Sequence, residues 1–334
     1  MATIKDIAHV TGLGIATISK YLNGGSVRPK NRDAIEKAIA DLNYRVNVHA
    51  RGLKTKRSMT VGAIIPELDN VFITTILSQI AHVLRQHGYS LIICGCQSDE
   101  NQERDAVRFL MDKAVDGIIN MPINRSGDHL EAAVDSALPV VLIDRNVNSL
   151  RSAASCVLVD NVSVSAKATQ ALLDAGHTRI GIIAGPPDIF TSRQRLLGYN
   201  QAHMHSGLMP DPELAVYGNY TVQGGHDAAR RLIDRGATAL FATNYEMTLG
   251  SIVALNEAGL KISGDISFVG FDNMQITDII TPRLTIVTQP LREIGERAAH
   301  IMLDRLSSEE PGEPVCETLP ADIVWGDSIA APGR

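Results

Sequence analysis

The sequence predicts a small all-α helix-turn-helix domain at the N-terminus, followed by a larger two-lobed α/β core. Three observations support this. Basic residues gather in the first 57 positions, three short helical patterns precede residue 46, and a β-α-β rhythm repeats in two halves after residue 59. A length of 334 residues, with 45% hydrophobic and 20% charged residues, is typical of a folded chain with more than one domain.

The charge is unevenly distributed along the chain. Residues 1–57 hold eleven Lys and Arg against four acidic residues, a net charge of +7. The whole chain carries −6, so the remainder carries −13. A basic head on an acidic body indicates that the head binds a polyanion and the body does not. A solvated basic face with no partner is the alternative that charge alone leaves open.

The head reads as three helices. Thr3 and Asp6 resemble a capping box that begins the first helix, and Gly12-Leu13-Gly14 ends it in a tight turn. A second helical pattern covers residues 15–22 and stops at Asn23-Gly24-Gly25. Pro29 suits the first turn of a third helix. Two helices joined by a short glycine turn and backed by a third predict a helix-turn-helix.

In that fold the second helix enters the major groove of DNA. Ile18 and Leu22 should pack inward, and the remaining side chains of this helix and its end are then free to contact bases and phosphates. The candidate DNA-binding residues are Ile15, Ala16, Thr17, Ser19, Lys20 and Asn23. A small helical bundle that serves only for dimerisation is the alternative.

Residues 47–59 read as a short basic linker. A helix of this length is marginal in water, and Gly52 weakens it further, so we expect it to fold only on DNA. A linker that stays flexible and contacts nothing is the other possibility.

After residue 59, apolar runs alternate with helical patterns in two sets. Continuous Val and Ile runs are typical of parallel strands buried on both faces. Two such sheets place a ligand cleft between two lobes, at the carboxyl ends of the strands. The predicted strands are 60–65, 90–96, 116–120, 139–144 and 155–160 in the first half, and 179–185, 239–243, 266–272 and 284–290 in the second.

Two stretches near the N-terminus resemble a known family. TIKDIAHVTGLGIATISKYLNG, followed by LNYRVNVHARGLKTKRSMTVGAIIP, is similar to the lactose-repressor/galactose-repressor (LacI/GalR) family of bacterial transcription regulators, and the resemblance continues almost to the C-terminus. It implies a periplasmic-binding-protein-like core. We expect a DNA-binding domain at 1–46, a hinge at 47–59 and an effector-binding core at 60–334. The N-lobe would hold about 60–160 and 291–320, and the C-lobe about 161–290 and 321–330.

The resemblance also implies how the hinge works. In the family, paired hinge helices of a dimer lie in the minor groove and a leucine wedges into the central base step. The matching residue is Leu53, with Asn47, Ala50 and Lys54 beside it. A homodimer on a pseudo-palindromic operator follows. Three head positions depart from the family pattern: Gly14 replaces a usual Ser, Lys20 a commoner Arg, and Tyr21 a small aliphatic residue.

Polar and aromatic residues around the strand ends are candidates to grip a ligand. Carboxylates and amides can hold hydroxyl groups, and an aromatic ring can cover the apolar face of a sugar. Arg195 is taken from the resemblance, which also supports the others. The alternative for Asp160, Asn244 and Asp272 is capping of the following helix. The candidate ligand-binding residues are Phe72, Asp144, Asp160, Arg195, Tyr220, Asn244 and Asp272.

Several classes of protein are not supported. The sequence contains no GxxxxGK loop, GxSxG elbow or HExxH motif, so no enzyme is expected. The four cysteines are expected to be free thiols in a reducing compartment, and Cys94-x-Cys96 has no second pair that would make a metal site. We expect no cofactor, no signal peptide and no membrane span, and therefore a cytoplasmic protein.

The sequence thus predicts a sequence-specific repressor of sugar-utilisation genes, with operator affinity set by a sugar in the cleft. A purine-like corepressor or a protein co-regulator is the alternative effector. A solute-binding protein with no role on DNA is a remote alternative.

Overall fold

The computed structural model describes residues 2–22, 24–44, 57–123, 126–150, 152–272, 279–308 and 312–332. The chain divides into two compact units, a head over Met1–Ser58 and a body over Met59–Arg334. The predicted DNA contact Asn23 and the predicted hinge residues Asn47, Ala50, Leu53 and Lys54 lie outside the described residues.

The head consists of three helices: α1 (Ile4–Thr11), α2 (Ile15–Leu22) and α3 (Pro29–Asp41). Its core is small, with Ile7 of α1, Ile18 of α2, and Ile35 and Ala38 of α3 buried together. Asp6 accepts a hydrogen bond from the Thr3 backbone N–H at 2.7 Å, as the capping pattern predicted. The helix-turn-helix prediction is therefore confirmed in the fold.

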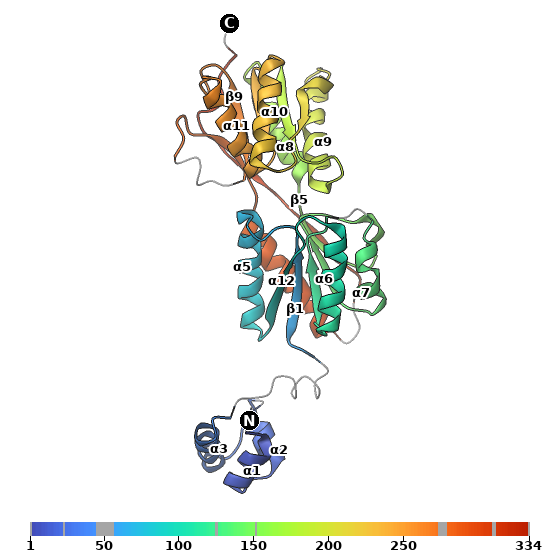
Figure 1. Cartoon of the computed structure of the whole chain (residues 1–334), viewed down its shortest axis with the longest axis vertical. Coiled ribbons are helices and arrows are strands. Elements are labelled where there is room, and N and C mark those ends of the chain that lie inside the picture. The colour runs from blue at the N-terminus through green and yellow to red at the C-terminus, as the bar shows by residue number, and fades with distance from the viewer. Residues whose placement is uncertain are drawn as a thin grey trace. The chain divides into compact units, whose positions relative to one another are not determined.

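The body contains two six-stranded sheets, each covered by helices on both faces (Figure 1). The strand order is β11-β5-β4-β3-β1-β2 in the N-lobe and β12-β10-β9-β8-β6-β7 in the C-lobe. Neighbouring strands are parallel, except that β10 and β12 are antiparallel. This confirms the two-lobed α/β core.

The elements of the N-lobe come from two stretches of the chain. They are β1 (Thr60–Ile65), α5 (Val71–Gln86), β2 (Ser90–Gly95), α6 (Glu100–Asp112), β3 (Gly117–Asn120), η1 (Asp128–Leu130), α7 (Glu131–Asp135), β4 (Val140–Ile143), η2 (Asn148–Leu150), β5 (Ser155–Val159), α12 (Leu291–Ser307) and β11 (Cys316–Leu319).

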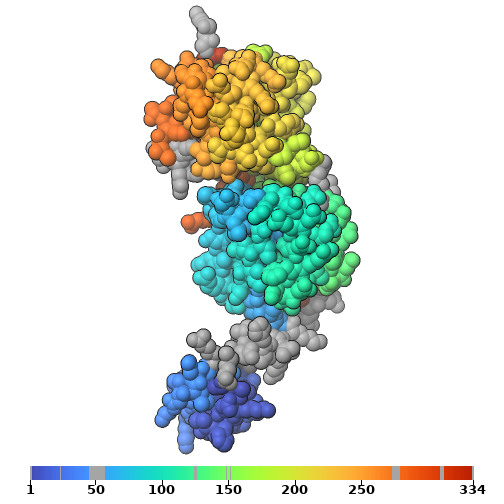
Figure 2. Space-filling view, viewed as in Figure 1, coloured from blue at the N-terminus to red at the C-terminus, as the bar shows by residue number. Residues whose placement is uncertain are grey.

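The C-lobe takes up the chain between β5 and α12, and its last part. Its elements are α8 (Asn161–Asp174), β6 (Ile180–Ala184), α9 (Phe190–His205), η3 (Pro212–Leu214), β7 (Ala215–Tyr217), α10 (Val222–Asp234), β8 (Ala239–Ala242), α11 (Tyr245–Glu257), β9 (Ser267–Phe271), β10 (Thr285–Thr288) and β12 (Asp322–Val324). The chain therefore crosses between lobes after β5, after β10 and after β11. In the space-filling view, the cyan and yellow surfaces of the two lobes meet at a waist (Figure 2).

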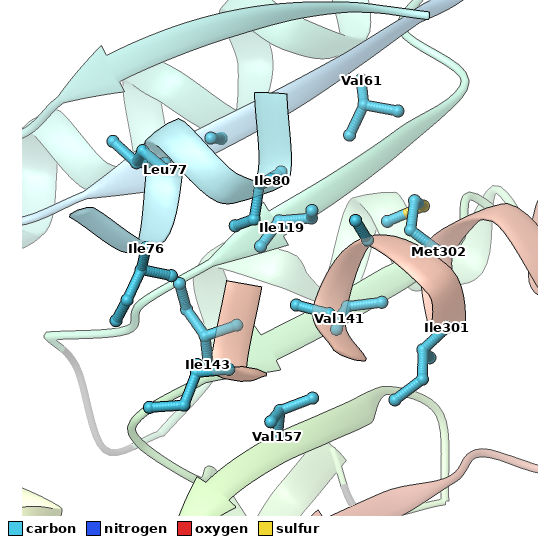
Figure 3. Close-up of a cluster of buried hydrophobic side chains, with 14 of the residues drawn as sticks. Val61, Ile76, Leu77, Ile80, Ile119, Val141, Ile143, Val157, Ile301 and Met302 are labelled. Atoms are coloured by element: carbon cyan, nitrogen blue, oxygen red, sulfur yellow. The ribbon is translucent and has the colours of Figure 1, made fainter. Parts of the chain in front are cut away.

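The strands are largely continuous apolar runs, and successive strand residues point to opposite sides. Each sheet is therefore hydrophobic on both faces. In the N-lobe, one side packs under α5 and α12, where Val61, Ile119 and Val141 meet Ile80 and Met302 (Figure 3). The other side packs under α6 and α7. Burying a side chain of this size contributes about 1.5–3 kcal/mol, so the two faces together stabilise the lobe.

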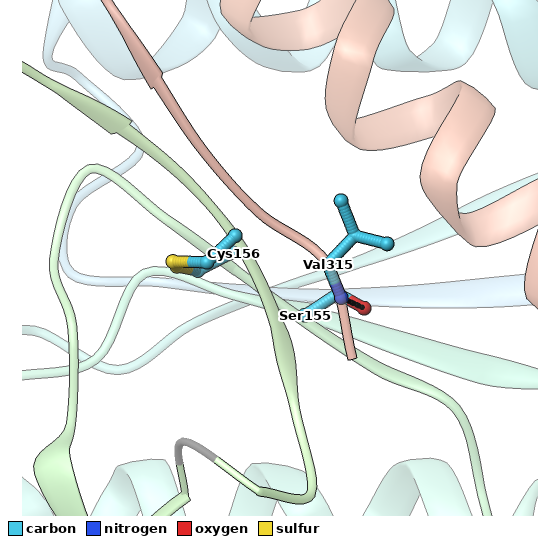
Figure 4. The surroundings of a disulfide bond; sticks show 4 residues. Ser155, Cys156 and Val315 are labelled. Carbon is cyan, nitrogen blue, oxygen red and sulfur yellow. Dashed lines mark hydrogen bonds between the residues drawn. A yellow bond between two sulfur atoms is a disulfide. The ribbon is translucent and has the colours of Figure 1, made fainter. Parts of the chain in front are cut away.

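Two cysteines depart from the sequence prediction. Cys156 of β5 and Cys316 of β11 lie opposite each other in the parallel register, and the structure joins them in a disulfide (Figure 4). The expectation of free thiols was wrong for this pair, because 160 residues separate them in the chain and only the strand pairing brings them together. Cys94 and Cys96 are free. Beside the disulfide, the Val315 backbone N–H donates to Ser155 Oγ at 3.1 Å.

Helix α10 contains two adjacent glycines, Gly224 and Gly225, which lower its intrinsic helix propensity. The structure explains this pair. A Cβ on Gly225 would lie 2.4 Å from Cα of Met247 in α11, and one on Gly224 would lie 1.8 Å from the carbonyl oxygen of Gly218. Only glycine lets α10 approach these backbones so closely.

We predict that Gly225→Ala destabilises the body by about 1–3 kcal/mol, because the backbone of Met247 cannot yield to a methyl group. The measurement is urea unfolding of the purified protein. Gly312→Ala is the control, since a Cβ there meets no atom within 4 Å. Equal stability of the two variants would contradict the packing argument.

Candidate functional site

The first candidate surface is the outer side of α2 in the head. Ile18 is fully buried and Leu22 half-buried, as predicted, while Ile15, Ala16 and Lys20 are exposed. Ile15 is 47% exposed, so its side chain is accessible on the outer side of α2. Thr17 and Ser19 are half-buried. The described part of the predicted DNA surface thus combines apolar, hydroxyl and cationic side chains on one short helix.

Tyr21, which departs from the family pattern, packs in the head. Its hydroxyl donates to Glu36 Oε1 of α3 at 2.7 Å, and its ring lies against the small core. This contact ties the end of α2 to α3. The geometry thus gives Tyr21 a partner within the protein.

The second candidate surface is a cavity of about 850 Å³ in the body. Its walls come from loops that follow the carboxyl ends of β1, β2, β3 and β4 in the N-lobe and of β6, β7 and β8 in the C-lobe. A cavity of this size at the carboxyl ends of parallel strands suits a small organic ligand.

Five of the seven predicted ligand-binding residues line this cavity. They are Phe72, Asp144, Arg195, Tyr220 and Asn244. Asp272 is buried just outside the lining, with its Oδ1 accepting a hydrogen bond from Gln289 Nε2 at 2.8 Å. Asp160 is not part of the lining either. Its carboxylate accepts from the Ser163 backbone N–H at 3.0 Å and caps α8, as the capping alternative predicted.

Arg195 is the best-anchored cation of the cavity. It is 4% exposed, its Nε donates to Asn161 Oδ1 at 2.7 Å, and its Nη1 donates to the Thr243 carbonyl oxygen. Its Cζ lies 3.8 Å from the centre of the Phe271 ring, a cation–π contact. The guanidinium is therefore held in one orientation before any ligand enters.

Two buried carboxyls lie near this guanidinium, one from each lobe. Asp144 follows β4 and Asp272 follows β9, each with a left-handed backbone, at φ 63° and 60° respectively. Burial raises the pKa of Asp272 to about 6, and Arg195 and the hydrogen bond from Gln289 oppose that rise. Burial likewise raises the pKa of Asp144, with Arg145 and Arg195 acting against it. Both carboxyls therefore sit in an environment that disfavours their charge.

Asp144 and Arg145 line the cavity, and each has a buried polar atom without a hydrogen-bond partner among the described residues. Asp144 is 5% exposed, and its Oδ1 has no hydrogen-bond partner among the described residues, nor does Arg145 Nε. Asp144 Oδ2 lies 3.5 Å from Arg145 Nε. A buried acceptor and donor without partners are costly unless a ligand or water satisfies them. They can hold one hydroxyl group as donor and acceptor.

The C-lobe contributes an aromatic wall to the cavity, formed by the ring of Tyr220 in the loop after β7. Asn219 and Tyr220 both have left-handed backbones, at φ 54° and 56°. The Tyr220 hydroxyl lies 3.2 Å from Thr191 Oγ1, and its ring covers Gly185 so closely that a Cβ there would lie 2.1 Å from the ring. Non-glycine residues held in this conformation concentrate at functional sites.

A hydrogen-bond chain joins the two lobes at the cavity. Asn70, which caps α5, donates through Nδ2 to Glu246 Oε1 at 2.9 Å, and Asn244, which caps α11, donates to the other oxygen of Glu246. Burial raises the pKa of Glu246, and the nearby Asp272 and Asp69 add to the rise. The sequence pattern did not single out Glu246, because nothing in the first turn of a helix reveals which residue of the other lobe it will face.

Neither a metal-binding cluster nor a membrane-spanning helix is present among the described residues. Within the described residues, no group of three His, Cys, Asp or Glu side chains is arranged to hold a metal ion. None of the helices in the described parts has the length and hydropathy that a membrane crossing demands. Burial raises the pKa of the Cys96 thiol to about 12, so this cysteine is a poor nucleophile.

A helix-turn-helix head on a two-lobed core with a ligand-sized cavity is the architecture of a ligand-responsive DNA-binding regulator. Comparison with known proteins agrees. Residues 3–47 match the model of bacterial regulatory proteins of the lacI family, and residues 58–317 match the model of periplasmic binding proteins and the sugar binding domain of the LacI family. The chain belongs to the LacI family of transcription regulators.

Individual relatives extend over nearly the whole chain. Catabolite control protein A of Priestia megaterium is 32% identical over 98% of each chain. The HTH-type transcriptional repressor CytR of Escherichia coli strain K12 is 31% identical over 93% of this chain and 92% of its own. Among solved structures, the complex of the transcriptional regulator CelR with cellobiose has a TM-score of 0.75 at 28% identity, covering 98% of this chain and 100% of that one. The resemblance is confirmed, and the alternative of a solute-binding protein with no role on DNA falls.

The buried carboxyl of Asp272 leads to a prediction about pH. Its pKa in the folded body is about 6, above the 3.8 of an unperturbed Asp, so the folded state holds the proton more tightly. The group therefore stabilises the fold below its unfolded pKa, and this contribution is lost as the pH rises through about 6. Relative to the wild type, Asp272→Asn should gain roughly 3 kcal/mol of stability between about pH 4 and pH 7.

Urea unfolding at both pH values measures the difference. Asp135→Asn, exposed on α7, is the control and should follow the wild type. Stability curves of Asp272→Asn and wild type that run parallel with pH would show that the carboxyl is not perturbed.

Proposed function

We propose that this regulator is a repressor of sugar-utilisation genes that works by binding and not by catalysis. A sugar in the cavity of the body sets its affinity for operator DNA. The observation that carries this proposal is the pairing of unsatisfied polar atoms on Asp144 and Arg145 with an aromatic wall at Tyr220 in one cavity. Such a combination of hydrogen-bonding groups and an apolar face suits a ring that bears several hydroxyl groups.

The relatives support the choice of ligand. The family model for residues 58–317 includes sugar binding domains, and the related regulator CelR was solved with cellobiose. Arg195 and Asn244 supply donors, while Asp144 supplies an acceptor, so a sugar hydroxyl finds both kinds of partner. Phe72 adds a second aromatic ring to the lining.

The cavity also offers a route from ligand to DNA. Its walls come from both lobes, and three chain crossings connect those lobes. A ligand that contacts both lobes binds one arrangement of the lobes more tightly than another. This difference in affinity is what allostery requires. We propose that this change is transmitted to the hinge at residues 47–59, where Leu53 of each protomer of a homodimer wedges into the minor groove, with Asn47, Ala50 and Lys54 beside it.

On DNA, α2 would read each half of a pseudo-palindromic operator. Ile15 and Ala16 can contact thymine methyl groups, and Lys20 can donate to guanine O6 and N7. The hydroxyl groups of Thr17 and Ser19 would contact phosphates, and Asn23 would contact the DNA from the end of the helix. A regulator of bacterial genes works beside the chromosome, so we place the protein in the cytoplasm.

The proposal is tested by thermal unfolding of the full-length protein against a panel of free sugars, sugar phosphates and purine bases. A ligand at a hundred times its Kd adds roughly 2.7 kcal/mol to the stability of the state that binds it. We expect the shift from a sugar. A shift from a purine base alone would favour stacking on Phe72 and Tyr220 and a purine-like corepressor. A protein co-regulator would leave the whole panel without effect.

The structure provides a matched pair of variants for this measurement. Asp144→Ala removes the unsatisfied acceptor and should abolish the shift. Asp160→Asn should keep it, since Asp160 lies outside the cavity lining and Asn caps a helix as well as Asp does. Loss of the shift in both variants would mean that the cavity lining does not define the binding site.

The role of Lys20 can be tested separately. We predict that Lys20→Ala relaxes the base preference within each half-site and costs about 1–3 kcal/mol of operator binding. The measurement is selection of operator sequences from a random pool, followed by titration of the selected sites. Lys37→Ala, exposed on α3, is the control for loss of one positive charge. An unchanged consensus for Lys20→Ala would identify Lys20 as a phosphate contact only.

A further inference from the structure

The lining of the cavity is acidic. Glu67 and Asp69 follow β1, Glu100 begins α6 and Glu246 lies in the first turn of α11, and all four line the cavity. Asp69 and Glu100 are exposed, while Glu67 and Glu246 are half-buried. We call these four residues the rim carboxylates.

The cations of the cavity do not offset the rim. Among the described residues of the lining, Arg145 and Arg195 are the only Lys or Arg, against five carboxylates. Arg195 is bound to Asn161, to the Thr243 carbonyl and to the Phe271 ring. Arg145 lies beside Asp144 and donates to the Pro122 carbonyl at 3.1 Å. Both guanidiniums are engaged with the protein at the inner end of the cavity.

Four helix N-termini at the cavity, a kind of site that commonly binds phosphate, are occupied, while α9, whose N-cap Ile189 lines the cavity with Thr191, has no side-chain cap. The N-terminal N–H groups of α5 and α11 are capped by Asn70 and Asn244, and those of α10 by Thr221. At α6 the cap is the carboxylate of Asp99, which accepts from two backbone N–H groups at 2.9 Å each. The positive ends of these helices therefore already have acceptors, and one of those acceptors is an anion.

A second observation points to a ligand in the same cavity. Asp144 is more than nine-tenths buried, lines the cavity and leaves Oδ1 without a partner among the described residues. A carboxyl oxygen in that position accepts a hydrogen bond from a hydroxyl or an amine, whereas a dianionic phosphate group has no hydrogen to donate to it.

We propose that the cavity selects its effector by charge, taking an unphosphorylated sugar and excluding the phosphorylated form of the same sugar. This inference rests on the proposed function for the identity of the ligand. The sign of the electrostatic potential follows from the lining residues alone. The rim carboxylates set a negative potential across the entrance, and low-dielectric walls strengthen it. A sugar phosphate, with nearly two negative charges, must pass and occupy this region.

The field can be measured without knowing the effector. In a Phe72→Trp reporter, a Trp lines the cavity, and Trp325→Phe removes the one natural tryptophan. We expect caesium ion to quench this fluorescence several-fold more efficiently than iodide, with acrylamide as the neutral reference. If Phe72→Trp does not fold, Tyr245→Trp places the reporter in the same lining.

The rim is then neutralised with Glu67→Gln, Asp69→Asn and Glu100→Gln together. Glu246 is left in place because it holds Asn70 and Asn244. The ratio of caesium quenching to iodide quenching should fall toward one. The control triple variant makes the same change of charge outside the lining, at Asp112, Glu131 and Asp135, and should keep the ratio. Equal quenching by the two ions in the unaltered rim, or no response to its neutralisation, overturns the proposal.

Affinities complete the test with matched probes: D-ribose with ribose 5-phosphate, and D-glucose with glucosamine and glucose 6-phosphate. For a sugar that binds, the phosphate should bind at least tenfold more weakly, about 1.4 kcal/mol, and the rim triple variant should narrow the gap. A phosphate that binds as tightly as the free sugar overturns the inference. If no probe binds while quenching reveals the acidic entrance, the sugar proposal fails and the charge selection stands.

Discussion

Every property of the cavity depends on the parallel pairing of strands within each lobe. Because neighbouring strands run in one direction, the loops after them meet at one edge of the sheet. The backbone N–H of Asp144 donates to Val157 and that of Asp272 to Val287, so each residue continues its ladder by one step. Both carboxyls are thereby fixed at corresponding sheet ends, and both reach the neighbourhood of Arg195.

Burial then gives these groups their chemistry. Arg195 would be an ordinary cation on the surface, but its contacts with Asn161, Thr243 and Phe271 hold it in place and set the field around it. The same burial makes ionised Asp144 and Asp272 unfavourable, which leaves their oxygens ready for a hydroxyl. At the entrance the carboxylates are closer to water, where they act at longer range on what approaches. The cavity thus distinguishes ligands by hydrogen bonding inside and by charge outside.

The head uses a simpler arrangement. Three buried isoleucines and an alanine are enough to fix three short helices, and this small core keeps Ile15, Ala16 and Lys20 on the outside of α2. The hydrogen bond from Tyr21 to Glu36 adds a polar tie to α3 at the end of the same helix. A core this small contributes little stability. The helix caps and glycine turns of the head therefore matter as much as its hydrophobic contacts.

The sequence by itself determined the helix-turn-helix, nine of the twelve described strands and five residues of the cavity, because hydrophobic periodicity, glycine turns and family motifs are local signals. It could not separate Asp160 from Asp144, since an aspartate after a strand looks the same whether it caps a helix or faces a ligand. Only the tertiary structure decided that difference. It also paired Cys156 with Cys316, brought Glu246 to Asn70, and gathered four acids from three separate segments in one cavity lining. These are long-range contacts, set by sheet register and lobe closure, and no short stretch of sequence encodes them.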